Sequence, residues 1–142
     1  MTNFTTRMTI AAAALVAAAG VASAQTMRAE IPFTFRANGV VMAAGSYRIT
    51  LDPLGGAPIL YLFNVEGHRS VTARALAPHD PPKAWQQAAT PLLSFACGAK
   101  LCSLAGLWTG DQAPAYHFAV PKLGRDETVR TALIELRYTK GD

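Results

Sequence analysis

Apolar and polar residues alternate with a period of two along much of the chain. The segment 29–36 has apolar residues at every second position, namely Ala29, Ile31, Phe33 and Phe35. The segments 46–51 and 116–120 repeat this alternation. Such a period is typical of a β-strand that buries one face, so we predict a strand at each segment. Pro32 cannot donate a hydrogen bond to a neighbouring strand, which predicts an edge strand or an outward-facing position there.

Continuous apolar runs and turn residues indicate further strands. The apolar runs lie at 59–63, 92–97 and 101–108. Asn38-Gly39 is a tight-turn dipeptide, and the segment 64–68 contains a glycine that closes a hairpin into a strand at 70–76. Gly98-Ala99-Lys100 separates the last two apolar runs and predicts another hairpin. Trp108 lies within the second of these runs, so we expect it in the core.

The last stretch of the chain, 126–138, fits two patterns. Val129, Leu133 and Leu136 have helical spacing, whereas the residues at 132, 134, 136 and 138 alternate as in a strand. We predict a strand over 131–138, with or without a helical turn before it. Seven to eight short strands, separated by turns about every 8–12 residues, predict an all-β fold. The architecture would be a single antiparallel sandwich or a small barrel.

The first 24 residues have the pattern of a secretory signal peptide. Arg7 precedes an apolar run from Ile10 to Val21, and Ala22-Ser23-Ala24 provides the small residues of a cleavage site. We therefore predict cleavage between Ala24 and Gln25, a single domain over 25–142, and a secreted or periplasmic location. A membrane-anchoring helix is the alternative, but the run is shorter than the ~20 residues that span a bilayer. The stiff segment with Pro78, Pro81 and Pro82 is not a domain boundary, because each side alone is too small for a core.

Composition supports a folded domain and weakens the case for a nucleic-acid partner. Apolar residues make up 51% and charged residues 15% of the 142, which is too apolar for a disordered chain. The full chain has a formal charge of +4, and loss of Arg7 with the leader leaves +3. The basic residues are dispersed along the sequence, whereas a nucleic-acid surface would concentrate them. We therefore expect no nucleic-acid partner and no membrane span in the mature chain.

Several of these segments resemble a family of small exported proteins of unassigned function that are abundant in Acidobacteria. The resemblance is carried by Glu30-Ile31-Pro32-Phe33-Thr34-Phe35 and by Met42-Ala43-Ala44-Gly45-Ser46-Tyr47. Leu107-Trp108-Thr109-Gly110 and Val120-Pro121-Lys122 are similar to a later aromatic strand and proline turn of the family. This chain lacks the proline that the family has before Ala44-Gly45. The resemblance covers about half of the mature chain and implies a secreted β-rich domain, but its motifs are structural and supply no functional residues.

Cys97 and Cys102 are the two cysteines of the chain, and they flank the predicted hairpin turn. An exported protein enters an oxidising compartment, and a cross-strand pair can reach the Cα separation of about 5.5 Å that a disulfide needs. We predict a structural disulfide. Two free thiols are the alternative. Redox catalysis is disfavoured, because such pairs usually have C-x-x-C spacing at the start of a helix.

Residues with catalytic or metal-binding potential are few and scattered. His68, His79 and His117 have no spacing typical of a metal site, so we expect no metal and no cofactor. The chain has no nucleophile elbow, zinc-protease, phosphate-loop or dinucleotide motif. Trp85 follows the proline segment and is flanked by Gln and Lys. It is either an exposed platform for a sugar or peptide or, with greater weight, a side chain that folds back over one end of the domain.

These observations favour a non-enzymatic exported β-domain that binds a partner or has a structural role. The partner would be a protein or a glycan of the cell envelope or exterior. The expected contact surfaces are the proline–Trp85 loop and an exposed sheet edge, where unpaired backbone groups can recruit another strand. Two alternatives remain open: a small barrel that carries an apolar ligand, and an enzyme with no recognisable motif. A packed interior would favour the first hypothesis and an apolar cavity the second.

Overall fold

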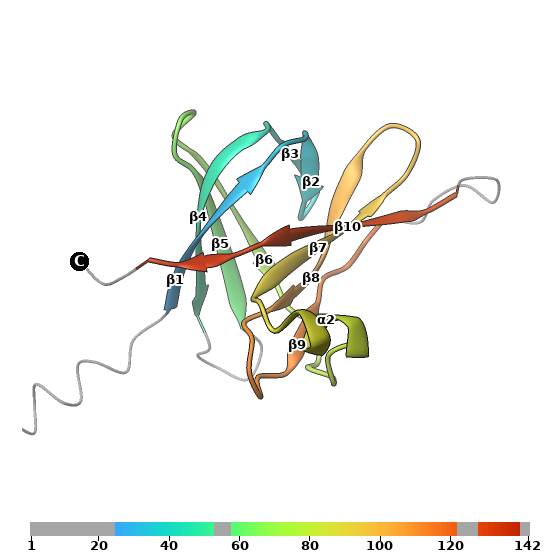
Figure 1. The fold of residues 1–142 in the computed structure, drawn as a ribbon. Coiled ribbons are helices and arrows are strands. Elements are labelled where there is room, and N and C mark those ends of the chain that lie inside the picture. Colours follow the sequence, from blue (N-terminus) through green and yellow to red (C-terminus); the bar gives the residue numbers. More distant parts are fainter. Residues whose placement is uncertain (1–24, 53–57, 122–127, 140–142) are drawn as a thin grey trace, which may run out of the picture.

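The computed structural model of the protein describes residues 25–52, 58–121 and 128–139, and these form two β-sheets and one short helix (Figure 1). Sheet A has the strand order β11 (Arg137–Tyr138), β1 (Gln25–Ile31), β4 (Gly45–Asp52), β5 (Ile59–Asn64) and β6 (Arg69–Arg74). Sheet B has the order β10 (Arg130–Glu135), β7 (Leu92–Cys97), β8 (Cys102–Trp108), β2 (Phe35–Ala37) and β3 (Val40–Met42). The three-residue strand β9 (Ala115–His117) also pairs with β8. The predicted leader, 1–24, lies outside the described residues.

Sheet A is an antiparallel arrangement of strands whose inner faces follow the predicted alternation. In β4 the apolar residues Tyr47, Ile49 and Leu51 are buried, while Arg48 between them is exposed. The turn at 64–68 joins β5 to β6 as predicted. Asn38 and Gly39 both have positive φ angles, 49° and 76°, and they form the tight turn between β2 and β3.

The segment 29–36 is divided between the two sheets instead of forming one strand. β1 ends at Ile31 in sheet A, and β2 begins at Phe35 in sheet B. Pro32 lies at the break, where its missing N–H group interrupts strand pairing. The chain thereby crosses from one sheet to the other, and β2 pairs with β8 in parallel at Phe35↔Cys102. The sheets are therefore antiparallel except at this short pair.

The C-terminal segment is a strand that also passes from one sheet to the other. β10 pairs with β7 in sheet B, and after Leu136 the chain continues as β11, which pairs with β1 in sheet A. In Figure 1 this strand runs in red across the middle of the molecule. The structure confirms a strand in this part of the chain.

The structure is a two-sheet β-fold that is not closed into a barrel. It has eleven strands in the described residues, more than the seven to eight predicted. The predicted strands 29–36 and 131–138 are each divided in two, and the short strand β3 follows the Asn38-Gly39 turn. The space between the sheets is filled by a single core cluster. The largest side chains of that cluster, each less than 2% exposed, are Tyr47, Phe35, Phe95, Met27, Ile31, Met42, Ile49, Leu60, Leu62, Leu93 and Leu107.

The proline segment leads into a helix that the sequence patterns did not predict. Helix α2 (Lys83–Ala88) begins directly after Pro82, whose carbonyl oxygen accepts a hydrogen bond from the N–H of Trp85 at 3.0 Å. It ends at Ala89, which has the left-handed conformation typical of a helix C-terminus. A helix of six residues has little amphipathic periodicity, which explains why the pattern of the sequence did not show it.

Candidate functional site

The outer edge of β10 is one of the strand edges that no other strand covers in the described residues, together with those of β6 and β3. On its inner side β10 pairs with β7 from Arg130↔Cys97 to Glu135↔Leu92. Within the described ranges, no strand pairs with its other side. The N–H of Leu136 donates to the carbonyl of Pro91 at 2.8 Å, so even-numbered backbone groups point toward β7. Because backbone direction alternates along a strand, the N–H and C=O groups of Thr131, Leu133 and Glu135 point outward.

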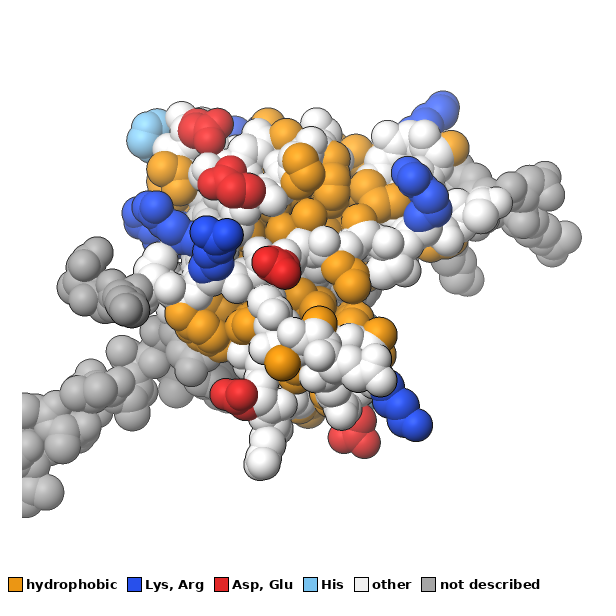
Figure 2. Space-filling model, in the orientation of Figure 1, with side chains coloured by type: hydrophobic (Ala, Val, Ile, Leu, Met, Phe, Trp, Pro, Cys, Tyr) orange, Lys and Arg blue, Asp and Glu red, His pale blue; other side chains and the backbone are white. Residues whose placement is uncertain are grey.

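The side chains of this strand also divide between core and solvent. Ala132 and Ile134 are partly buried against the core cluster. Val129 and Leu133 lie on the opposite face and are 51% and 48% exposed. Figure 2 shows hydrophobic side chains at the surface in the middle of this face of the molecule. The β10 segment therefore combines outward backbone groups with exposed apolar side chains, which is the usual composition of a strand-docking edge.

A groove separates β10 from β1 where the two sheets diverge. β11 pairs with β1 at only two positions, Met27↔Tyr138 and Arg28↔Arg137, and beyond them the strands separate. The resulting open groove has a volume of about 540 Å³ and is lined by Arg28, Ala29, Glu30, Pro32, Leu133, Ile134, Glu135 and Arg137. Its charges are balanced, with two Arg and two Glu residues, so it has no strong preference for an anion or a cation.

The sequence predicted an exposed sheet edge without assigning it to the C-terminal strand. The pattern that could have located it is the presence of apolar residues at both even-numbered and odd-numbered positions of this strand, and therefore on both of its faces. Ala132 and Ile134 occupy the core-facing positions, while Val129 and Leu133 occupy the other positions. An apolar residue on the solvent face of a strand at a sheet edge indicates a contact surface.

Trp85 does not form the exposed platform considered above. Its side chain is only 8% exposed and packs with Trp108, Leu92 and Ala115 in a second, smaller cluster. A Cβ atom at Gly106 would lie 3.3 Å from the Trp85 ring, so the glycine leaves room for the indole. The sequence favoured a Trp85 side chain that folds back over the domain, and this is the position that Trp85 has in the structure. Trp108 is buried, as predicted.

The structure brings two of the three histidines together. His79 and His117 stack with ring centroids 3.7 Å apart and an interplanar angle of 12°. Backbone hydrogen bonds between His79 and Ala115, of 2.8 and 3.0 Å, hold the two segments side by side. His68 lies elsewhere, exposed in the β5–β6 turn and near the ring of Phe63. In the described part of the chain, no group of three or more His, Cys, Asp or Glu side chains could hold a metal ion.

A buried polar pair shapes the turn between β5 and β6. The Tyr47 hydroxyl donates to the carbonyl of Ala43 and accepts a hydrogen bond of 3.1 Å from the Asn64 amide. The Asn64 oxygen accepts from the N–H groups of Glu66 and Gly67 at 3.0 and 2.9 Å. Burial is the main cause that raises the pKa of Tyr47 above its ordinary value of 10.0. Since these hydrogen bonds engage both side chains, the pair has a structural role.

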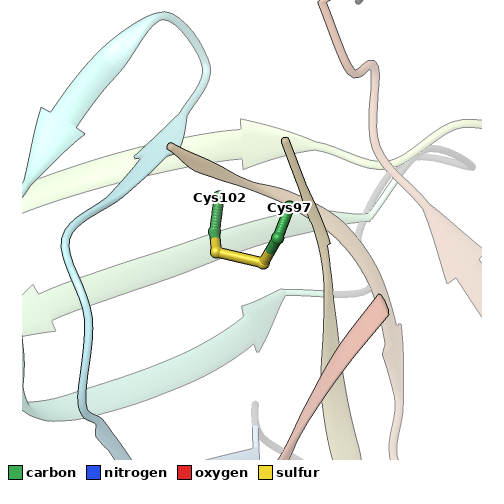
Figure 3. Close-up of a disulfide and its surroundings, with 2 residues drawn as sticks. All are labelled: Cys97 and Cys102. Carbon is green, nitrogen blue, oxygen red and sulfur yellow. A yellow bond between two sulfur atoms is a disulfide. The ribbon is translucent and has the colours of Figure 1, made fainter. Parts of the chain in front are cut away.

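Cys97 and Cys102 form a disulfide at the turn end of the β7–β8 hairpin (Figure 3). The two residues are direct cross-strand partners, and the N–H of Gly98 donates to the carbonyl of Leu101 just beyond them. Their Cα atoms are 3.9 Å apart, closer than the separation expected from the sequence. Opposed residues approach each other most closely where they exchange no backbone hydrogen bonds, which is the position of this pair. The bond fixes the register of the hairpin next to the start of β10.

Comparisons with protein-family models, with curated proteins and with solved structures give no match to this chain. The fold and the site therefore define the protein only as a disulfide-containing two-sheet β-domain with an open C-terminal strand edge. Across the described ranges, no helix has the length and apolar character needed to cross a membrane.

Proposed function

We propose that this chain is an exported, non-enzymatic β-domain that binds a partner polypeptide along the outer edge of β10. The observation that carries the proposal is the combination of a filled interior with an open strand edge. Thr131, Leu133 and Glu135 direct backbone donors and acceptors outward, and Val129 and Leu133 add apolar surface beside them. A partner that supplies an extended strand would satisfy both kinds of group.

A strand partner fits this edge better than a glycan does. The surface offers a row of backbone groups at strand spacing, and a polypeptide matches that spacing residue by residue. Trp85, the aromatic side chain with which a sugar could have stacked, is buried. β3 is another edge with exposed apolar side chains, but it has only three residues and so offers a shorter row of backbone groups than β10. The edge strand β6 is as long as β10, but its exposed side chains are polar or charged, which is a usual protection of a sheet edge.

The filled interior supports binding at the surface rather than inside the domain. Phe35, Phe95 and Leu62 belong to the core cluster and are fully buried. An apolar ligand would need a cavity of several hundred Å³ lined mainly by hydrophobic side chains. The groove between β1 and β10 has that volume, but it is open and half of its lining residues are charged.

Two features support the exported location. The leader pattern at 1–24 would direct the chain across the membrane, with Gln25 as the first mature residue. The disulfide between Cys97 and Cys102 is of a kind that persists in oxidising compartments and is rare in the cytosol. Cell fractionation and intact-mass measurement test this part, and a cytosolic chain that retains Met1 would contradict it.

Photocrosslinking tests the binding surface. A photoreactive phenylalanine analogue replaces Leu133, 48% exposed on β10, in cells that export the protein. The matched control places it at Val41, which is 46% exposed on the edge strand β3. We expect a discrete protein adduct from position 133 and none from position 41. The absence of any adduct at position 133, with the protein exported and folded, would refute the proposal.

A further inference from the structure

We infer that the strand that pairs with β10 is the β10 of a second copy of this chain. This inference rests on the proposed function, because it uses the same edge and specifies its occupant. The two strands would run antiparallel about a two-fold axis at Thr131 and join two copies of sheet B into one continuous sheet. Closed two-fold pairing is the commonest way in which identical chains associate.

Backbone geometry limits how two copies can pair. A two-fold axis perpendicular to the sheet keeps each side chain on the same face of the sheet. Odd-numbered residues of one copy therefore oppose odd-numbered residues of the other, and even-numbered residues oppose even-numbered ones. The outward backbone groups of β10 belong to odd-numbered residues. An odd residue of one copy must therefore oppose an odd residue of the other to form the hydrogen-bonded pairs of an antiparallel ladder. Any axis that passes through a residue of β10 satisfies this condition, so the side chains decide the register. An axis at Ala132, for example, would place Val129 opposite the charged Glu135.

The side chains favour the axis at Thr131. In that register Val129 opposes Leu133 of the second copy, and Thr131 opposes Thr131. The two most exposed apolar side chains of the strand thereby cover each other, and such cross-strand apolar pairs stabilise a sheet. An axis at Leu133 would instead place Val129 opposite the charged Arg137.

The position of β10 in the fold leaves this register accessible. Its first residues lie far from β1, toward the right-hand end of the red strand in Figure 1. Thr128, Val129, Arg130 and Thr131 are all exposed. Leu133 and Glu135, at the other end, line the groove next to β1, so a strand centred on Thr131 would enter the open groove only at Leu133.

Charge gives the association a specific salt dependence. The mature chain has a net charge of +3, and the two Arg130 side chains would lie diagonally across the new pair. Repulsion between like charges opposes pairing and is screened by salt. The dimer should therefore become tighter as ionic strength rises, and Arg130→Ala should strengthen it.

Sedimentation velocity on the exported, processed protein tests the inference across a concentration series. We expect a monomer–dimer equilibrium. Thr131→Pro removes an outward N–H group and leaves the β7 pairing intact, so it should weaken the dimer by about tenfold to a hundredfold. Leu133→Lys should weaken it comparably, whereas Val41→Lys on β3 should leave it unchanged. Circular dichroism checks that each variant is folded.

The outcomes separate this inference from the proposed function. A monomer at all concentrations, or a dimer that Thr131→Pro leaves unchanged while Val41→Lys disrupts it, would overturn the inference. In that case a crosslinked adduct at position 133 with the mass of a different protein would still support binding at the β10 edge. An adduct of two identical chains, lost in Thr131→Pro, would support both.

Discussion

Replacement of Phe35 by Ala is a demanding test of the two-sheet architecture. Phe35 is 0% exposed and belongs to the short strand β2, which the chain places in sheet B after the break at Pro32. Its ring makes edge-to-face contacts with Tyr47 from sheet A and Phe95 from sheet B, each with ring centroids 5.3 Å apart. The side chain therefore links the inner faces of both sheets.

The expected cost follows from this packing. Removal of a fully buried aromatic ring typically lowers the free energy of unfolding by about 3–5 kcal/mol, because buried apolar area is lost and a cavity remains. Two aromatic contacts are lost as well, each worth about 0.5–1.5 kcal/mol, so the upper part of that range is expected. A domain of this size is typically stable by about 5–15 kcal/mol, so the variant should still fold but with a reduced margin.

Urea denaturation measures the change, with tryptophan fluorescence and circular dichroism as probes. Trp85 and Trp108 belong to the second cluster, so agreement between the two probes shows that both clusters unfold together. Phe63→Ala is the matched control, because Phe63 is only partly buried on β5 and should cost about 1–2 kcal/mol. If Phe35→Ala costs no more than Phe63→Ala, then the Phe35 side chain does not lie between the two sheets and the two-sheet architecture is wrong.

Three further measurements probe other parts of the structure. Replacement of both Cys97 and Cys102 by serine should lower the free energy of unfolding by about 2 kcal/mol, because the disulfide closes only a short loop. Alkylation of both thiols in the absence of reductant would show instead that the disulfide does not form. The pKa of Tyr47 is raised by burial, so its contribution to stability is present below pH 10 and declines as pH rises through the folded-state pKa. Stability should therefore decrease above pH 10, and Tyr47→Phe should flatten that decrease without abolishing it, since the pKa of Tyr138 is raised as well. Trp85→Ala should cost about 3–5 kcal/mol in urea denaturation, as for a buried ring, whereas an exposed platform would give almost no change.

The sequence by itself determined the local elements of this protein. Alternation with a period of two predicted β4, because its three buried residues occupy every second position. The Asn38-Gly39 dipeptide predicted the β2–β3 turn, since both residues tolerate positive φ angles. Cys97 and Cys102 predicted the disulfide, because they flank a hairpin turn whose two strands are adjacent in the chain. Each of these features depends on residues that are close in sequence.

Only the tertiary structure decided which strands pair and which surfaces remain open. Alternation with a period of two shows that a strand has an apolar face, but it does not specify the sheet to which the strand belongs. For this reason the sequence did not predict that the chain crosses from sheet A to sheet B between β1 and β2, or that β2 pairs in parallel with β8. Trp85 is buried because Trp108 and Ala115, distant in the chain, pack against it. The edge of β10 that no described strand covers has the same physical origin. A strand carries backbone groups on both sides, and the arrangement of all the other strands determines which side is left without a partner.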